Sequence, residues 1–406
     1  MRAVPFAILA AAAALLAGAA TAGAQPAGLR EPERLRPGIS VLLDDQISVV
    51  RGRRVVLITD GSARDERGER VDDLLKNDKR ARAARVVVVA TWQPDLLSGF
   101  ERGPFGTGMA ADAARLADLG RTMDSVTAPA QTIVVDLMDD GFRTGAAPWV
   151  VLAALRAGAH HQLQVVLLDR PNPLTGEHVE GPAVDSLSGA SDALYGLPAR
   201  HGMTLGEIAR WFNATGAIGA SLTVVPVRGW RRSTWATDRV ALPRQRDGSQ
   251  SSVEQLAMFG ALAPLAETNL LIAAGPGRTT VRVGAPWLQA KGLAGLLNDR
   301  LMAGVKFRSG RDDFHGANGA LMQFPCVYVE VTDRDRASGL RVLAGLLAEV
   351  HRLQADSLRF AAAFDRAAGS DALRLAVLTG EDPDAMADRQ LANVVDFRRR
   401  ARGVLL

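Results

Sequence analysis

Four short apolar runs, each followed directly by polar residues, constrain the fold of this chain more than any other feature. They lie at 53–59, 86–90, 132–137 and 165–168, and helix-like segments lie at 39–50, 71–84, 109–119 and 149–159. Short apolar runs bounded by polar residues are typical of buried strands. Strands that alternate with helices predict right-handed βαβ units and a mostly parallel sheet. We therefore predict an α/β fold, with a Rossmann-like domain over residues 38–240.

The polar residues after these runs should meet at one edge of the sheet. They are Thr59-Asp60, Thr91-Trp92-Gln93, the segment 136–143, and Asp169-Arg170. In open α/β sheets, ligands bind at the carboxyl edge of the strands, so this edge is the expected site. No GxGxxG motif follows the first run, and a nucleotide cofactor is therefore not indicated.

The segment 168–182 is the most informative of these polar ends, with three prolines, two glycines and five ionisable side chains. Pro171 and Pro173 restrict the backbone on both sides of Asn172, which should hold that side chain in few orientations. A rigid ligand-binding loop and a well-capped turn with a solvated salt bridge both fit these residue types. The residues alone leave the two interpretations open.

A second motif, 201–212, begins at His201 and leads into a helix. Thr204 is a good N-cap residue, and Glu207 stands three residues later, which predicts a capping box. Glu207 therefore has a structural role available to it. His201 lies just before the positive end of this helix, where a neutral imidazole is favoured. Of the adjacent acids Asp139 and Asp140, we expect one to point inward and the other to be solvated.

The pattern changes after residue 250, where helices and strands no longer alternate. Residues 250–406 predict a second, smaller α+β domain whose charged, helical tail should pack on the outside. The loop between the two domains carries Trp230 and Trp235. Tryptophan in a polar loop suits either stacking on a sugar face or anchoring the loop against the protein.

The first 24 residues resemble a signal peptide, with Arg2 before an Ala/Leu-rich core and Ala22-Gly23-Ala24 as the cleavage site. We expect an exported protein, periplasmic or secreted, with no membrane span after cleavage; an uncleaved anchor is the alternative. Losing Arg2 lowers the net charge from +4 to +3, which is too small to indicate a nucleic-acid partner. A single cysteine excludes an internal disulfide, and no motif indicates a zinc site.

Three segments together resemble the signatures of one known family. They are Leu-Asp-Arg-Pro-Asn-Pro at 168–173, Val-Glu-Gly-Pro at 179–182 and Arg-His-Gly-Met-Thr-Leu-Gly-Glu at 200–207. In order and spacing they are similar to the DUF1343 family, whose characterised members are exo-β-N-acetylmuramidases of the NamZ type. Segments 55–60, 136–143, 267–269 and 283–287 are also similar, so that the resemblance covers residues 38–355.

The resemblance implies a Rossmann-like domain joined to a smaller α+β domain, with the active site in the cleft between them. It implies removal of a terminal N-acetylmuramic acid from the non-reducing end of peptidoglycan fragments. The implied partner is thus a peptidoglycan-derived saccharide, and no metal or organic cofactor is expected. The oligomeric state does not follow from it.

The chain departs from the family at one place that matters for catalysis. Members carry Pro-Glu-His-Gly after the second strand, and that Glu is the leading catalytic candidate. Here Trp92 and Gln93 take the place of the Glu-His pair. Glycoside hydrolysis usually needs two carboxyl groups, and neither Trp nor Gln supplies one.

Three hypotheses follow: a divergent glycosidase, a muropeptide or glycan binder that has lost catalysis, and family-like loops that only hold the domains together. For a glycosidase, the carboxylates that could act are Asp136, Asp139, Asp169 and Glu207. Arginines suit the lactyl carboxylate of the substrate, and Asn suits its acetamido or hydroxyl groups. The substrate-binding candidates are Arg143, Arg170, Asn172, Glu180, His201, Asn269 and Arg278.

Overall fold

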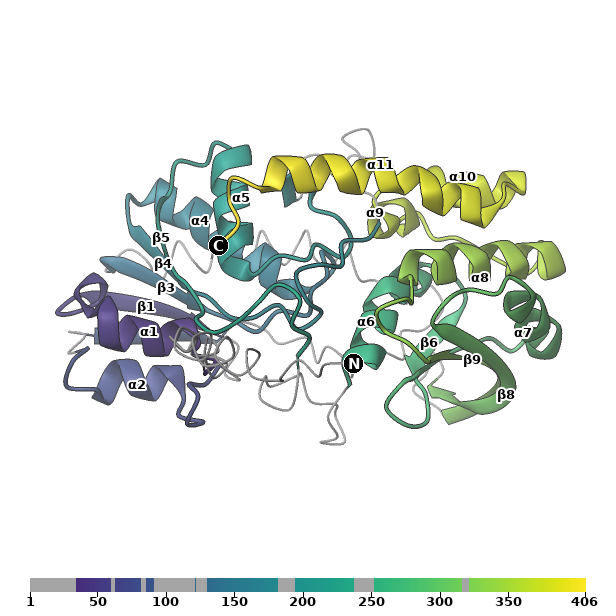
Figure 1. Ribbon diagram of the computed structural model, residues 1–406, viewed down its shortest axis with the longest axis horizontal. Coiled ribbons are helices and arrows are strands. Elements are labelled where there is room, and N and C mark those ends of the chain that lie inside the picture. The colour runs from purple at the N-terminus through teal and green to yellow at the C-terminus, as the bar shows by residue number, and fades with distance from the viewer. Residues whose placement is uncertain are drawn as a thin grey trace, which may run out of the picture. The chain divides into compact units, whose positions relative to one another are not determined.

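Five short strands form a parallel sheet in the order β2-β1-β3-β4-β5 (Figure 1). The structure, a computed structural model, describes residues 34–59, 63–81, 85–90, 121, 130–181, 194–236, 252–315 and 321–406. The chain passes from β1 to one side and returns to β3 on the other, so the order reverses between these two strands. Their carboxyl ends make the switch point where such sheets bind ligands. The strands are β1 (Arg54–Thr59), β2 (Arg85–Ala90), β3 (Thr132–Asp136), β4 (Gln164–Leu168) and β5 (Ser221–Val225).

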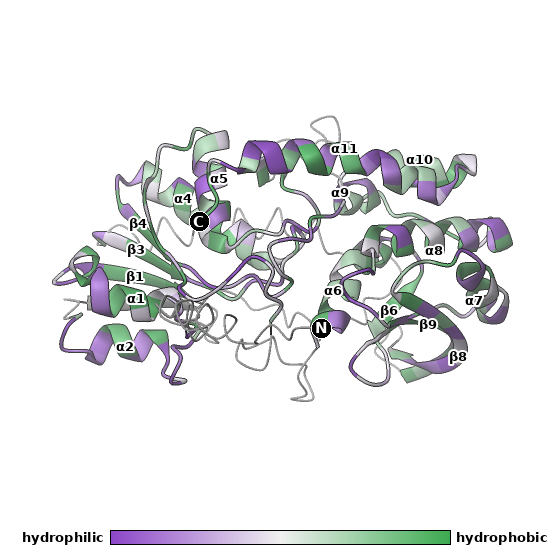
Figure 2. Cartoon of the chain, in the orientation of Figure 1, coloured by the Kyte–Doolittle hydropathy of each residue, from purple (hydrophilic) through white to green (hydrophobic). Residues whose placement is uncertain are grey.

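Helices cover both faces of this sheet. In β1, Val55 and Leu57 pack toward α1 (Gly38–Asp45) and α2 (Val71–Asn77), whereas Val56 and Ile58 pack toward α4 (Ala146–His160) and α5 (Leu205–Thr215). Because both faces are buried, every position from Val55 to Ile58 is apolar rather than every second one. Figure 2 shows hydrophobic strands that lead into hydrophilic loops.

A second, antiparallel sheet follows in the order β6-β7-β9-β8. Its core packs the sheet against helices, and it includes Val281, Val329, Leu293 and Leu346. The predicted α/β fold with a second, smaller α+β domain is thus confirmed. The strands are β6 (Leu271–Ala274), β7 (Thr280–Gly284), β8 (Val305–His315) and β9 (Leu321–Val331), and the helices are α6 (Val253–Leu262), α7 (Ala290–Asp299) and α8 (Gly339–Gln354).

The tail differs from the expectation that it packs only on the outside. It forms α9 (Phe364–Ala368), α10 (Ala372–Thr379) and α11 (Pro383–Ala401), and α11 contributes to both cores. Its Met386 belongs to the core of the second domain. Its Phe397 is 1% exposed in the core of the first domain, edge-on to Trp211 with ring centroids 5.2 Å apart. One helix therefore packs against the cores of both domains (Figure 1).

Several predicted boundaries also differ. The first helix ends at Asp45 because Gln46 leaves helical geometry, and a 3-10 turn, η1 (Ile47–Val49), follows. The helix predicted over 71–84 ends at Asn77, because Asp78 accepts a hydrogen bond from the Arg80 backbone and forms a turn. In the second domain, β8 and β9 pair with each other along eleven positions.

The helix predicted over 109–119 lies outside the described residues. Within the described residues, two further 3-10 turns are η3 (Leu194–Gly196) and η4 (Ala263–Glu267). Among the described residues, no helix has the length and apolar character needed to cross a membrane.

Candidate functional site

Asp139 and His201 form a buried pair beyond the carboxyl end of β3. Their side chains are 4% and 0% exposed, and Nε2 of His201 lies 3.3 Å from Oδ2 of Asp139. Nδ1 of His201 accepts a hydrogen bond from the Met203 backbone N–H, so the imidazole proton sits on Nε2, facing Asp139. Within the described part of the chain, neither oxygen of Asp139 nor Nε2 of His201 makes a hydrogen bond. Buried polar atoms left in this state need an explanation, and a role in binding or catalysis is one.

Asp140 is also buried, which contradicts the expectation that one of the two adjacent acids is solvated. Its Oδ1 accepts a hydrogen bond of 2.8 Å from the Phe142 backbone N–H, and its carboxyl packs against Gly145. Burial, reinforced by the neighbouring charge of Asp139, raises the pKa of Asp140 to about 8. Asp140 therefore keeps its proton near neutral pH. Gly141, with φ +85°, permits this turn.

Asp136 and Arg170 pair at the switch point. The Asp136 side chain is fully buried at the end of β3, and Arg170 donates to it from Nε and, at 3.0 Å, from Nη2. A buried bidentate pair fixes both groups, because breaking it leaves an uncompensated charge. These contacts favour a structural role for both residues, and their catalytic and substrate-binding roles stay predictions.

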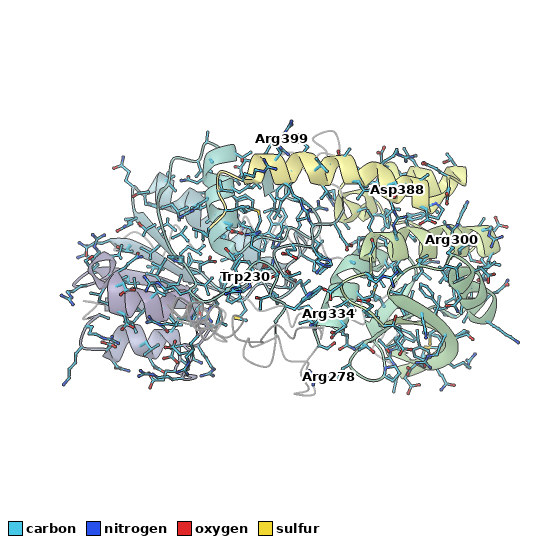
Figure 3. The ribbon with its side chains drawn as sticks, viewed as in Figure 1. Trp230, Arg278, Arg300, Arg334, Asp388 and Arg399 are labelled. Atoms are coloured by element: carbon cyan, nitrogen blue, oxygen red, sulfur yellow. The ribbon has the colours of Figure 1, made fainter. Side chains whose placement is uncertain are left out.

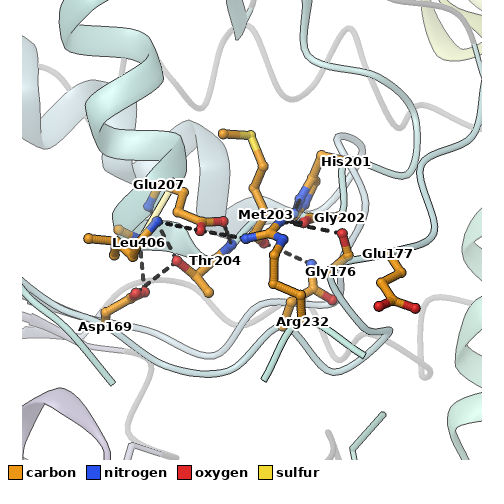
Figure 4. A network of polar contacts seen from close by, with 12 residues as sticks. Asp169, Gly176, Glu177, His201, Gly202, Met203, Thr204, Glu207, Arg232 and Leu406 are labelled. Carbon is orange, nitrogen blue, oxygen red and sulfur yellow. Dashed lines mark hydrogen bonds and ion pairs between the residues drawn. The ribbon is translucent and has the colours of Figure 1, made fainter. Parts of the chain in front are cut away.

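Asp169 lies in a network that satisfies its carboxylate (Figure 4). It accepts hydrogen bonds from the Thr204 hydroxyl at 2.7 Å, the Gly206 backbone at 2.8 Å and the Arg170 backbone at 3.0 Å. Burial raises the pKa of Asp169 to about 7, opposed by the Gly206 and Thr204 hydrogen bonds. This network fastens the start of α5 to the end of β4.

Glu207 continues the same network. The predicted capping box is confirmed: Thr204 accepts from the Glu207 backbone, and Glu207 accepts from the Thr204 backbone at 3.0 Å. Glu207 also accepts from Arg232 at 2.6 Å and from the Leu406 backbone at 2.9 Å. The carboxylate is therefore occupied by structural contacts, and its catalytic role stays a prediction.

Asn172 is held as the flanking prolines suggest. Its Nδ2 donates to the Met203 carbonyl at 2.7 Å, and its Oδ1 accepts from the Leu174 backbone at 2.8 Å. The amide thus links the 168–182 segment to the motif that carries His201. Substrate binding by Asn172 stays a prediction.

Arg143 and Glu180 reach the second domain. Arg143 donates to the carbonyls of Leu197, at 3.2 Å, and Ala367, at 3.4 Å, and burial lowers its pKa to about 10. Glu180 accepts from the backbone of Gly339 at 2.9 Å, at the start of α8. Both residues, predicted to bind substrate, make contacts that join the two domains.

Asn269 and Arg278 lie in the second domain. The Asn269 amide donates to the Ser357 carbonyl at 2.7 Å and accepts from the Arg359 backbone at 2.9 Å. Arg278 is exposed between β6 and β7 (Figure 3). No contact between described residues joins either of them to Asp139 or His201, and their substrate-binding roles stay predictions.

The two loop tryptophans have different surroundings, and sugar stacking stays a prediction. Trp235 is 7% exposed, and its Nε1 donates to Asp335 at 2.8 Å. The guanidinium groups of Arg200 and Arg334 lie 5.0 and 5.2 Å from its ring centre. Trp235 is a loop anchor. Trp230 is partly exposed, with the Arg232 guanidinium 5.7 Å from its ring centre.

A cavity of about 750 Å³ borders His201. The signature loop 176–180, the segment 201–203, Arg232 and the end of α11 form its walls. Its α11 wall includes Arg398 and Arg402, and no local sequence signal marked these three arginines as part of a site. Gly202, with φ +61°, allows the chain to pass close to the 176–180 loop, since a Cβ there would lie 2.9 Å from the Val179 side chain.

The positions that replace the family's Glu-His, Trp92 and Gln93, lie outside the described residues. Among the described residues, no three His, Cys, Asp or Glu side chains gather in a metal-binding group. The site described here therefore consists of the Asp139–His201 pair, the neighbouring Asp140 and the cavity.

Two family models match this chain. The N-terminal part of the exo-beta-N-acetylmuramidase NamZ model matches residues 120–243, and the C-terminal part matches residues 258–406. The peptidoglycan beta-N-acetylmuramidase NamZ of Bacillus subtilis is 25% identical over 403 aligned residues, which cover 92% of this chain and 91% of that protein.

Two solved structures are similar in fold. Both are DUF1343 family proteins from Bacteroides fragilis NCTC 9343. The first has a TM-score of 0.73 at 21% identity, and the second a TM-score of 0.62 at 16% identity. In each comparison, the match covers 92% of this chain and 99% of the other.

Proposed function

This chain belongs to the NamZ family of exo-β-N-acetylmuramidases, and we propose that it hydrolyses a terminal, non-reducing N-acetylmuramic acid from peptidoglycan fragments. One observation supports this proposal most. The Asp139 carboxylate and Nε2 of His201 face each other in a buried position with no hydrogen bond from the described residues, and His201 lines the cavity. Keeping such a pair costs stability, which favours a role in binding or chemistry.

The reaction needs one proton donor and one proton acceptor. Hydrolysis breaks the bond between the anomeric carbon and the leaving oxygen; the leaving oxygen gains a proton, and the attacking water loses one. We assign the basic role to the Asp139–His201 pair. Asp140, whose pKa is raised to about 8, is the carboxyl that remains protonated near neutral pH and matches the acid.

A binding protein without turnover is the second candidate, and the replacement of the family's Glu-His by Trp92-Gln93 favours it. In that case, the cavity would hold a muropeptide or glycan without cleaving it. Restoring the pair with Trp92→Glu and Gln93→His tests the idea from the opposite direction, since turnover should then appear or rise.

We also propose that the protein is exported, periplasmic or secreted. The signal-like residues 1–24 support this, as does the location of peptidoglycan outside the inner membrane. Comparing the mass and N-terminal sequence of the protein from the cell envelope with those of its precursor tests this proposal.

One pair of measurements separates the two candidate functions. The mature protein is incubated with a chromogenic N-acetylmuramide, and calorimetry measures the binding of a muropeptide. Chromophore release that disappears in Asp139→Asn supports the enzyme. Binding without release would overturn hydrolysis and leave the binder, and absence of both would overturn the proposed function.

A further inference from the structure

Two arginines at the end of α11 border the cavity beside His201. Arg398 and Arg402 stand one helical turn apart on the same face, and both line the cavity. Phe397 and Ala401, next to them in the sequence, are 1% and 3% exposed in the core of the first domain. The buried neighbours fix this end of α11, so the backbone positions of both arginines are fixed at the wall.

The arginines on α11 differ in their ion pairs. Arg399 and Arg400 both pair with Asp396, on the same helix. Arg398 instead donates to the backbone carbonyl of Glu177, which ties α11 to the signature loop. Within the described ranges, no carboxylate pairs with Arg398 or Arg402.

The acids near the cavity are largely compensated. Glu180 accepts from the start of α8 and lies 3.7 Å from Arg200. Glu207 is paired with Arg232. Glu177 also lines the cavity, and its side chain is exposed. Among the described residues, no cationic side chain pairs with its carboxylate. The α11 side of the cavity is thus cationic and can accept one carboxylate.

Two other arginines that the sequence predicts to bind the substrate carboxylate have other contacts. Arg170 holds Asp136, and Arg143 donates to two backbone carbonyls between the domains. A carboxylate in the cavity would therefore meet α11 first.

We infer that Arg398 and Arg402 bind the lactyl carboxylate of the N-acetylmuramic acid ligand and so distinguish it from N-acetylglucosamine. This inference rests on the proposed function, because it assigns part of the same sugar to one wall of the cavity. The two sugars differ only in the lactyl ether, which carries the carboxylate. A guanidinium forms two parallel hydrogen bonds to a carboxylate and thereby provides this selectivity.

Calorimetry with the two free sugars tests the inference without requiring turnover. We expect the protein to bind N-acetylmuramic acid at least about tenfold more tightly than N-acetylglucosamine. The double variant Arg398→Gln/Arg402→Gln should lose this preference and leave N-acetylglucosamine binding unchanged. Arg402→Lys should keep part of it, because the charge remains while the paired geometry is lost.

Arg399→Gln is the matched control. Arg399 is the next residue on the same helix, its side chain is 73% exposed, and it lies outside the cavity lining (Figure 3). This variant should bind both sugars as the wild type does, and thermal melting should show that all variants are folded.

Each other outcome is decisive. If the double variant keeps the preference, or loses both sugars equally, the carboxylate role of α11 is overturned. If the wild type binds both sugars equally, the inference is wrong while the proposed function stands. If neither sugar binds and no substrate is cleaved, the proposed function is overturned as well.

Discussion

Two buried polar clusters lie within the same signature segments, and they differ in how well they are hydrogen-bonded. Asp169 accepts three hydrogen bonds that join β4 to α5. Asp139 faces His201 and accepts none from the described residues. Both side chains are acids near strand ends, and the sequence predicts the same catalytic role for both. A satisfied acid stabilises the fold, whereas an unsatisfied one costs stability and needs another reason to be kept.

The largest effect that tests this comparison is on turnover. Asp139→Asn should lower chromophore release about a thousandfold, within the range for losing an acid–base group. Its free energy of unfolding should stay unchanged or rise, because a buried charge is removed. Urea denaturation beside the release assay measures both. Retained turnover, or a large loss of stability, would place Asp139 with the structural cluster.

The second effect is on stability. Asp169→Ala should lower the free energy of unfolding by roughly 3 kcal/mol, because three donors lose their acceptor in a buried site. Asp73→Ala, at an exposed acid on α2, should change it by less than about 0.5 kcal/mol. Denaturant titration compares the two. Equal small losses would show that the Asp169 network contributes little.

A smaller effect is expected at the cap of α5. Thr204→Ala removes the N-cap hydroxyl and one hydrogen bond to Asp169, and it should cost about 1–2 kcal/mol of unfolding free energy. In the Asp169→Ala background, the same change should cost less, since the two side chains share a contact. Additive losses in a double-mutant cycle would mean that the two positions act independently.

The last effect concerns the pH dependence of stability. The pKa of Asp140 is raised to about 8 in the folded state from an ordinary value of 3.8, so the folded state holds a proton that the unfolded state releases. Its contribution to stability is complete below about pH 4 and is lost as the pH rises toward 8, at no more than about 1.4 kcal/mol per pH unit. Asp140→Asn should flatten the stability profile over this window. An unchanged profile from pH 4 to 8 would contradict the shifted pKa.

Much of the candidate site could be located from the sequence. Polar residues after apolar runs placed Asp136, Asp139 and Asp169 at the sheet edge, and the Thr204–Glu207 spacing predicted the capping box that the structure contains. Their hydrogen-bond partners could not be predicted in the same way. The Asp136–Arg170 pair joins residues 34 positions apart, and Arg232 reaches Glu207 across 25.

The sequence by itself determined the α/β class, the second domain and the family, because periodicity, turn residues and signature spacing are local properties. Tertiary structure alone decided which acids are satisfied. It buried Asp140, assigned Arg143 and Glu180 to the domain interface, and placed Arg398 and Arg402 at the cavity. The physical reason is that burial, hydrogen bonding and charge depend on neighbours in space, and folding brings residues 398 and 402 beside a loop more than two hundred positions earlier.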